Sequence, residues 1–156
     1  MKKFGLIIVL VYSVSALYAQ QTETRNVGSF SGVKAAEGID VYLKKGEKES
    51  VKVEVTGSNA KPSDVLTEVS GSYLKVHMRD GNHRNTDAKV YVTYVQLDKL
   101  SASSAGSIYS DGTIKSNSME ISASSAGTIE VTLETGDLEA GSSSAGDIEL
   151  KGKAKS

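Results

Sequence analysis

The chain has 156 residues, a formal net charge of −1, no cysteine and no tryptophan. The missing cysteines exclude disulfides, thiol nucleophiles, thiolate metal sites and a lipid anchor on a cysteine. The balanced charge lacks the basic stripe of nucleic-acid-binding proteins, so we expect no nucleic-acid partner.

Residues 1–19 are expected to be a secretory signal peptide. Lys2 and Lys3 form a basic start, residues 6–11 are apolar, and small residues lead to a polar segment from Gln20. This order predicts cleavage after Ala19. The apolar run is far shorter than the ~20 residues that span a bilayer. We therefore expect an exported protein of the periplasm, the outer surface or the medium, with no membrane span after cleavage and no cysteine-linked lipid.

The remaining chain has the length of one domain. Residues 20–26 are interpreted as a short leader and residues 27–156 as a single β domain, of which residues 98–156 form a repeat half. A domain of this size buries roughly two-thirds of its unfolded surface, which is enough for a hydrophobic core.

Alternating apolar and polar residues predict an all-β fold, with little sign of helical periodicity. A first hairpin is expected from residues 39–43 and 51–55, and a second from residues 66–69 and 73–78. Residues 90–97 form the next predicted strand. The polar segments between these strands contain the only proline and several Asp, Asn and Gly residues, which favour turns. One helical turn from residue 64 is the weaker alternative for the start of the second hairpin.

Three near-copies of one phrase, Ser-Ala-Ser-Ser-Ala-Gly-x-Ile, follow. They begin at Ser101, Ser122 and Gly141, with spacings of 21 and 19 residues. Such a period is typical of repeat architectures. Residues 111–112 and 135–137 are predicted to be turns that close the units, so each unit would hold two or three short strands joined by a small-residue corner.

Two geometries fit such units: hairpins of an antiparallel meander, or coils of a β-solenoid. In a solenoid, equivalent residues lie one strand spacing apart, roughly 4.8 Å, so identical small side chains stack into ladders. In a meander equivalent residues lie two strands apart, so identical side chains of successive repeats would not contact one another. The near-identity therefore favours a β-solenoid or β-helix-like body, for which a right-handed coil is expected. We interpret the glycines as residues that tolerate left-handed corners.

The order of several motifs resembles the family called auto-transporter adhesin, head GIN domain. The first are Arg25-Asn-Val27, Phe30, Gly32-Val33 and Gly38-Ile39-Asp40-Val41-Tyr42-Leu43. Leu66-Thr67-Glu68-Val69, Tyr73-Leu74-Lys75-Val76 and the repeats continue the resemblance over essentially the whole domain. The resemblance implies an exported bacterial protein with a β-helix-like body and an adhesive or surface role, and it carries over no catalytic or binding residue.

Domains of that family usually continue for further coils, whereas this sequence stops at Ser156. A coil without a cap would expose unpaired backbone groups. We expect truncation first. The alternatives are that Lys151, Lys153 and Lys155 blunt the edge, or that another chain covers it, as in a homo-oligomer.

The residues offer little for catalysis, and no enzyme activity, cofactor or metal is expected. The serines lack a Gly-x-Ser-x-Gly elbow, and their repetition indicates stacking rather than activation. His77 is predicted to face solvent. Glutamates of the repeats alternate with apolar residues, which places them on the exposed face: Glu120, Glu130, Glu139 and Glu149.

The candidate surface-binding residues fall into two groups. Asp80, Asn82, His83 and Arg84 lie in one polar loop that suits a sugar or metal contact, although a solvated hairpin loop explains the same residues. Tyr91 and Tyr94 lie in one strand and are candidates for glycan contact.

Three functions remain open. The first is a non-enzymatic adhesin or cell-envelope interaction module, with an envelope protein or a glycan as partner. The alternative is a polysaccharide-binding or polysaccharide-processing β-helix protein. The third is a structural role in which coils of separate chains stack into an oligomer.

Overall fold

The computed structural model describes residues 20–155. The expected signal peptide, residues 1–19, lies outside the described residues. The predicted all-β class is confirmed, because the described residues form strands and one short 3₁₀ turn. Their bounds are β1 Gln21–Arg25, β2 Gly32–Ala35, β3 Asp40–Lys45, β4 Ser50–Thr56, η1 Pro62–Asp64, β5 Val65–Ser70, β6 Tyr73–Met78, β7 Asp87–Tyr94, β8 Lys99–Ala102, β9 Ser107–Ala123, β10 Thr128–Ser142 and β11 Asp147–Ala154.

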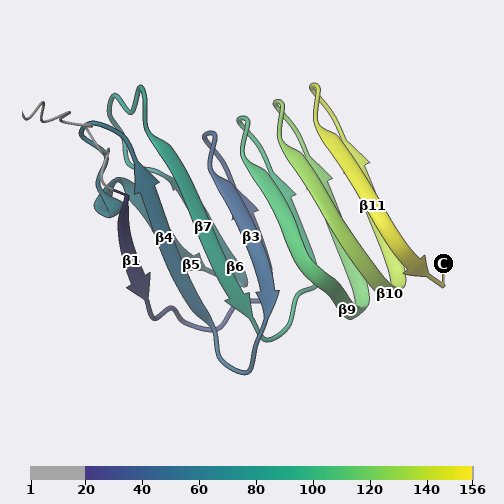
Figure 1. Ribbon diagram of the computed structural model, residues 1–156. Helices are drawn as coiled ribbons and strands as arrows, with labels where there is room; N and C mark the ends of the chain where they lie inside the picture. The colour runs from purple at the N-terminus through teal and green to yellow at the C-terminus, as the bar shows by residue number, and fades with distance from the viewer. Residues whose placement is uncertain (1–19, 156) are drawn as a thin grey trace, which may run out of the picture.

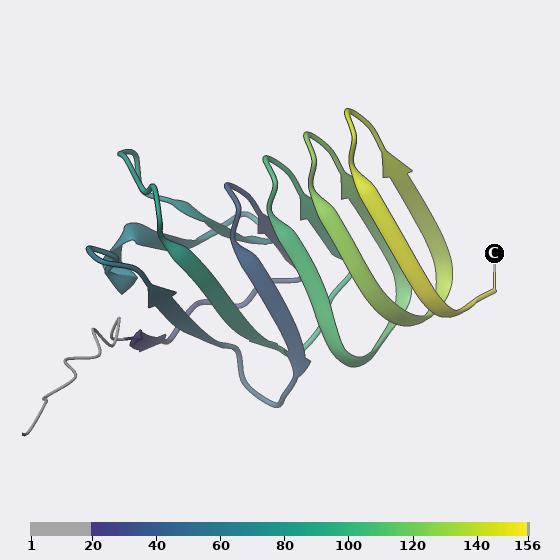
Figure 2. The same ribbon diagram turned by 45° about the horizontal axis from the view of Figure 1, so that its top comes forward.

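The strands belong to one sheet that curls over on itself (Figures 1 and 2). One layer runs in the order β1-β4-β7-β3-β9, and the chain of pairings returns through β8, β2, β6 and β5 in the other layer. The long strand β9 joins the layers because it pairs with β3 along its first part and with β8 along its last part. Strands β10 and β11 extend the stack beyond β9.

Neighbouring repeats pair in parallel, which excludes the antiparallel meander. Ser101 lies opposite Ser122, and Ser122 lies opposite Gly141, so the equivalent residues of successive copies are direct neighbours. The predicted hydroxyl stacking occurs here, since Ser122 Oγ donates to Ser101 Oγ at 3.1 Å.

The core lies between the two layers and consists of rows that cross the strands. Ile108 and Ile129 are fully buried register partners, and Ile148 continues their row. Leu100 and Ile121 form the corresponding row in the other layer. Strands such as β3, β4 and β7 bury alternate residues, and burial of such side chains contributes about 1.5–3 kcal/mol apiece. The apolar alternation read from the sequence is thus the pattern that fills the core.

The repeated phrase forms tight corners between the layers. In the second copy Ser125 and Ala126 have φ of 48° and 61°, and the N–H of Gly127 donates to the carbonyl of Ser124 at 2.8 Å. Two central residues with positive φ are the mark of a type I′ turn. The left-handed positions are therefore taken by Ser and Ala, and our assignment of them to glycine is wrong.

Glycine is required at these corners by close approach of the backbone. A Cβ on Gly127 would lie 2.3 Å from the carbonyl oxygen of Ala102 in the neighbouring repeat. The same oxygen accepts the N–H of Ser124 at 3.0 Å, so it cannot withdraw without breaking a bond between repeats. In the same way, a Cβ on Gly106 would lie 2.7 Å from the carbonyl oxygen of Ala35, and a Cβ on Gly146 would lie 2.4 Å from that of Ala123.

The expected turns at residues 111–112 and 135–137 are wrong, since β9 and β10 continue through them. Tyr109 pairs with Glu130, but Thr113 pairs with Thr132, so β9 carries two extra residues there. This bulge accounts for the change of repeat spacing from 21 to 19 residues. Ser110 Oγ accepts the N–H of Thr132 at 2.9 Å and replaces a lost ladder bond.

One of the two expected hairpins is wrong. β3 and β4 follow each other in the chain, but β7 lies between them, parallel to β3 and antiparallel to β4. β5 and β6 form the second hairpin as predicted. The leader also differs from expectation, because residues 21–25 form strand β1 on the edge of β4.

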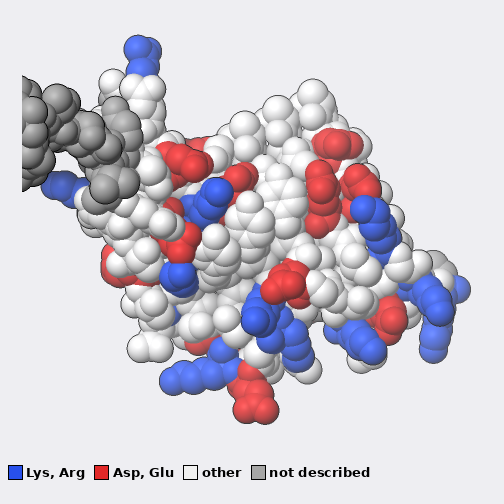
Figure 3. All heavy atoms as spheres, viewed as in Figure 1, with Lys and Arg blue, Asp and Glu red and all other residues white. Residues whose placement is uncertain are grey.

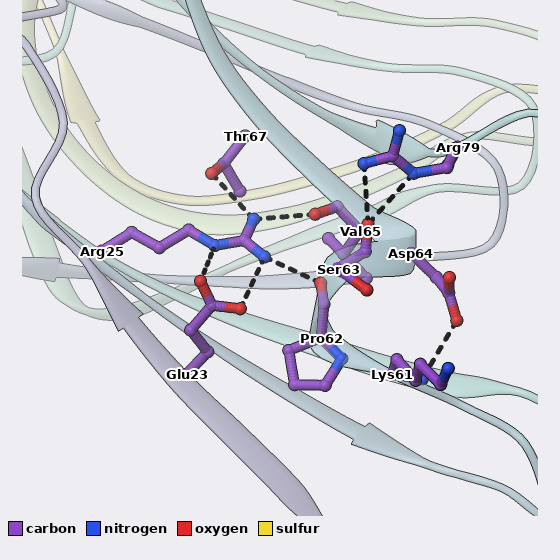
Figure 4. A network of polar contacts seen from close by, with 9 residues as sticks. All are labelled: Glu23, Arg25, Lys61, Pro62, Ser63, Asp64, Val65, Thr67 and Arg79. Carbon is purple, nitrogen blue, oxygen red and sulfur yellow. Dashed lines mark hydrogen bonds and ion pairs between the residues drawn. The ribbon is translucent and has the colours of Figure 1, made fainter.

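An arginine ties the leader strand to the rest of the sheet (Figure 4). The guanidinium of Arg25 donates to the carbonyls of Pro62 and Val65 at 2.7 Å each and to Thr67 Oγ1 at 3.1 Å. It also holds both carboxylate oxygens of Glu23, at 3.0 and 3.1 Å. The hydrogen bond from Arg25 lowers the pKa of Glu23 below its usual value. Arg25 thereby joins β1, η1 and β5 at one end of the stack.

The glycine contacts predict that two glycine-to-alanine substitutions will differ in their effect on the free energy of unfolding. Gly127→Ala should lower the free energy of unfolding by about 1–3 kcal/mol, because its Cβ forces neighbouring repeats apart. Gly141→Ala is the matched control, since a Cβ there meets nothing within 4 Å, and it should leave stability unchanged or slightly raised. Urea unfolding followed by circular dichroism measures both, and equal midpoints for the two variants would contradict the assigned role.

Candidate functional site

Three tyrosines form a row on the outer face of the sheet. Tyr91 of β7, Tyr42 of β3 and Tyr109 of β9 are register partners on adjacent strands. Each follows a buried valine or isoleucine, and alternation therefore turns its ring outward. The ring centroids of Tyr42 lie 5.3 Å from those of both neighbours, with interplanar angles of 21° and 24°. We call these three residues the tyrosine row.

Charged residues continue the line of the tyrosine row at both ends. The ammonium of Lys52 on β4 lies 5.3 Å from the ring centroid of Tyr91. At the other end Glu130 of β10 pairs with Tyr109, and Glu149 of β11 pairs with Glu130. Figure 3 shows this face, with an uncharged middle and acidic side chains gathered over β10 and β11. The row thus has an aromatic centre, the Lys52–Glu54 ion pair at one end and stacked glutamates at the other.

A hollow of about 440 Å³ opens beside the tyrosine row. Its sides combine the three rings with the polar side chains of Lys44, Thr93, Ser110 and Asp111. A smaller hollow of about 210 Å³ shares Tyr109 and Ser110 with the first and reaches Glu130, Thr132, Glu149 and Lys151. The larger hollow near the bends of the long strands is lined by Ser, Thr, Asn, Glu, Lys, Ala and Gly residues and has no aromatic side chain.

The local environment shifts the ionisation of several groups on this face. Burial among its neighbours, together with the nearby Asp40, raises the pKa of Tyr42 above its usual value. A hydrogen bond from Lys52 lowers the pKa of Glu54, and a hydrogen bond with Tyr91 contributes to the same effect. At neutral pH the Tyr42 hydroxyl is therefore a protonated donor, and the Glu54 carboxylate is charged.

The family model described as "putative auto-transporter adhesin, head GIN domain" matches residues 29–156. The chain belongs to this family. No curated protein sequence matches the chain significantly.

Solved structures show the same fold for this head GIN domain. A putative adhesin from Bacteroides fragilis NCTC 9343 superposes with a TM-score of 0.77 at 17% identity, over 87% of this chain and 64% of that one. A putative adhesin from Parabacteroides merdae ATCC 43184 superposes with a TM-score of 0.71 at 17% identity, over 86% of this chain and 58% of that one. A third putative adhesin, from Parabacteroides distasonis ATCC 8503, has a TM-score of 0.65 at 17% identity, over 87% of this chain and 67% of that one. The chain thus spans less than two-thirds of the length of the first two structures.

Of the two tyrosines expected on the surface of the head GIN domain, the structure exposes one. Tyr91 is 39% exposed, whereas Tyr94 is only 3% exposed. The prediction of Tyr94 as a surface-binding residue is therefore wrong. Both lie on β7, but three residues apart, and an odd spacing in a strand places them on opposite faces.

Sequence reasoning missed Tyr42 and Tyr109 as members of this site. The signal was present, since Val41-Tyr42, Val90-Tyr91 and Ile108-Tyr109 share a buried branched residue followed by tyrosine. The sequence does not reveal that β7 pairs with β3. This pairing arises because β7 lies between β3 and β4, which are consecutive in the chain.

The second predicted group occupies the loop between β6 and β7. His83 Nε2 is bonded to the carbonyl oxygen of Arg79, and Asn82 Oδ1 accepts the N–H of Arg84 at 3.2 Å. Asn82 and His83 therefore take part in the turn, while Asp80 and Arg84 are exposed. A binding role for Asp80, Asn82, His83 and Arg84 stays a prediction.

Within residues 20–155, no group of three or more histidine and carboxylate side chains is placed to hold a metal ion. In the same described part of the chain, no helix is long and apolar enough to cross a membrane. The glutamates of the repeats are exposed, as predicted, and they stack in pairs: Glu120 with Glu139, and Glu130 with Glu149.

The stacking geometry predicts unequal effects for tyrosine removal. Tyr42→Ala breaks two ring contacts and should cost about 1–3 kcal/mol of stability from stacking alone, whereas Tyr91→Ala breaks one and should cost about half as much. Tyr42→Phe keeps both ring contacts and should change stability little. Urea unfolding of the three variants measures the differences. A Tyr42→Ala variant no less stable than Tyr91→Ala would show that the rings do not support one another.

Proposed function

We propose that this head GIN domain is an exported, non-enzymatic module that binds a component of the bacterial cell envelope or cell surface. The observation that carries the proposal is the tyrosine row with its adjoining hollow on the outer face of the sheet. Aromatic side chains at an exposed concave site are typical of binding surfaces. Family membership points to the same adhesive class.

Export is supported by the features of residues 1–19, namely their basic start, apolar run and small residues before Gln20. A core built without disulfides is compatible with each exported destination, because the fold does not depend on a particular redox compartment. Periplasm, outer surface and medium all satisfy this proposal.

The proposed lack of catalysis is supported by the chemistry of the face. The carboxylates near the tyrosine row lie beside lysines, as Glu149 does with Lys151 at 2.8 Å. The serines of the corners form backbone turns and stacked hydroxyls rather than contacts with a general base.

The proposed body for this module is a β-solenoid in which each repeat adds one coil. The parallel pairing of repeats and the shared corner geometry support it. Because each coil contacts only its neighbours, such a body holds surface side chains at a fixed spacing. A right-handed coil, and association of chains through the C-terminal strand, stay predictions.

Binding to envelope fragments tests the proposal. Purified protein should co-sediment with cell-wall and outer-membrane fragments of its own host. A Tyr91→Ser, Tyr109→Ser double variant should lose about tenfold in affinity, since two of the three aromatic anchors are removed. Val69→Ser is the matched control, because Val69 is 38% exposed on β5, away from the tyrosine row.

Retention of binding by the control and its loss in the double variant is the expected result. A wild-type protein that binds no envelope fraction, or that converts an envelope polymer into products, would contradict the proposal.

A further inference from the structure

The two hollows on the outer face join into one shallow groove that crosses the strands. They share Tyr109 and Ser110, and together their sides come from β7, β3, β9, β10 and β11. Four strand steps of about 4.8 Å give the groove a length of about 19 Å. A ligand that fills it must therefore be extended and must run across the strands.

The stacking of the tyrosine row decides which parts of the rings a ligand can contact. Tyr42 has one neighbouring ring on each face, both with centroids at 5.3 Å, and Lys52 lies over Tyr91. Both faces of Tyr42 and of Tyr91 are thus occupied, and the Tyr91 hydroxyl bonds to Glu54. The ring edges and the hydroxyls of Tyr42 and Tyr109 remain for a ligand. Ring edges carry partial positive charge and the hydroxyls donate hydrogen bonds, which favours a ligand rich in neutral oxygen atoms. A cationic ligand would require free ring faces.

The rest of the groove mixes lysines with carboxylates, of which Glu130 and Glu149 lie at its acidic end. Lys44 and Asp111 are register partners at its edge, so a basic and an acidic group lie side by side. Ser110 and Thr93 add hydroxyls. Further along, Lys151 is paired with Glu149. Neighbouring donors and acceptors of both kinds suit vicinal hydroxyl groups, each of which donates and accepts.

We propose that this groove binds an extended, uncharged glycan chain, with successive sugar units over successive strands. The proposal rests on the proposed function and names the ligand class of the same face. The rise of one hexose unit in an extended chain is close to the spacing between strands, so the repeat of the ligand matches the repeat of the tyrosine row. The ring edges contact the sugar units, and the hydroxyls of Tyr42 and Tyr109, together with Lys44 and Asp111, bond to the sugar hydroxyls.

A panel of uncharged hexose oligomers, from disaccharide to hexasaccharide and with α and β linkages, tests this inference by titration calorimetry. Affinity for the preferred series should rise with length and level off near the tetrasaccharide or pentasaccharide, when the groove is filled. It should change little with ionic strength, because no ion pair forms with the ligand.

A triple variant, Tyr42→Phe, Tyr91→Phe and Tyr109→Phe, isolates the hydroxyls because it keeps the stacked rings. Its affinity for the best oligomer should fall about tenfold or more, since each lost hydrogen bond contributes a several-fold share. Tyr73→Phe is the matched control, because Tyr73 lies on β6 in the other layer. It should bind as the wild type does.

Several results would overturn the inference. They are no binding of any oligomer by the wild type, full affinity in the triple variant, or affinity that falls steeply with salt, as for a charged ligand. If envelope binding still requires Tyr91 and Tyr109 while no oligomer binds, the glycan is wrong and the proposed function stands. If oligomers bind but envelope fragments do not, the groove is a glycan site and the envelope role is wrong.

Discussion

The fold depends on how closely the backbones of neighbouring segments approach at the corners between the two layers. At Gly106, Gly127 and Gly146 a carbonyl group of the preceding parallel segment occupies the place of a side chain. Any other residue would separate the segments and break the hydrogen bonds that run between them. The small-residue phrase is repeated because each copy meets the same restriction. Its parallel, in-register stacking then brings the buried isoleucines of the repeats into continuous rows.

The same stacking creates the outer surface. When equivalent positions lie one strand apart, a residue type that recurs at one position becomes a row, and three tyrosines that are distant in the sequence become neighbours. The row ends where β10 and β11 substitute glutamates at that position. The sheet fixes the distance between neighbouring strands. Residues that alternate between buried and exposed positions therefore form a groove whose polar groups repeat at the strand spacing.

Much of the fold was predictable from local patterns. Alternation identified the strands, and near-identical repeats indicated parallel stacking, because identical neighbours gain only when they touch. What failed depended on distant segments. β3 and β4 were expected to pair because they are consecutive, but β7 enters between them. Asp111-Gly112 has the composition of a turn but lies in a bulge of β9. The sequence also did not show which residues of β7 face outward, so Tyr94 could not be distinguished from Tyr91.

The candidate site was less predictable than the fold for the same reason. Tyr91 was found because it is an exposed aromatic residue in a strand, but its partners come from β3 and β9, and only the pairing order brings them together. The role of Arg25, which bonds to two carbonyls of a segment some forty residues away, likewise has no local signal.

Cysteine cross-linking in this cysteine-free chain tests the stacking most directly. Ser101 Oγ and Ser122 Oγ lie 3.1 Å apart on the adjacent parallel strands β8 and β9, so Ser101→Cys with Ser122→Cys should form an intramolecular disulfide on mild oxidation. Ser101→Cys with Gly141→Cys spans two strand steps, about 9.6 Å, and should not. Rapid cross-linking of the first pair alone is the predicted result. Failure of the first pair, or equal cross-linking of both, would contradict parallel in-register stacking of the repeats.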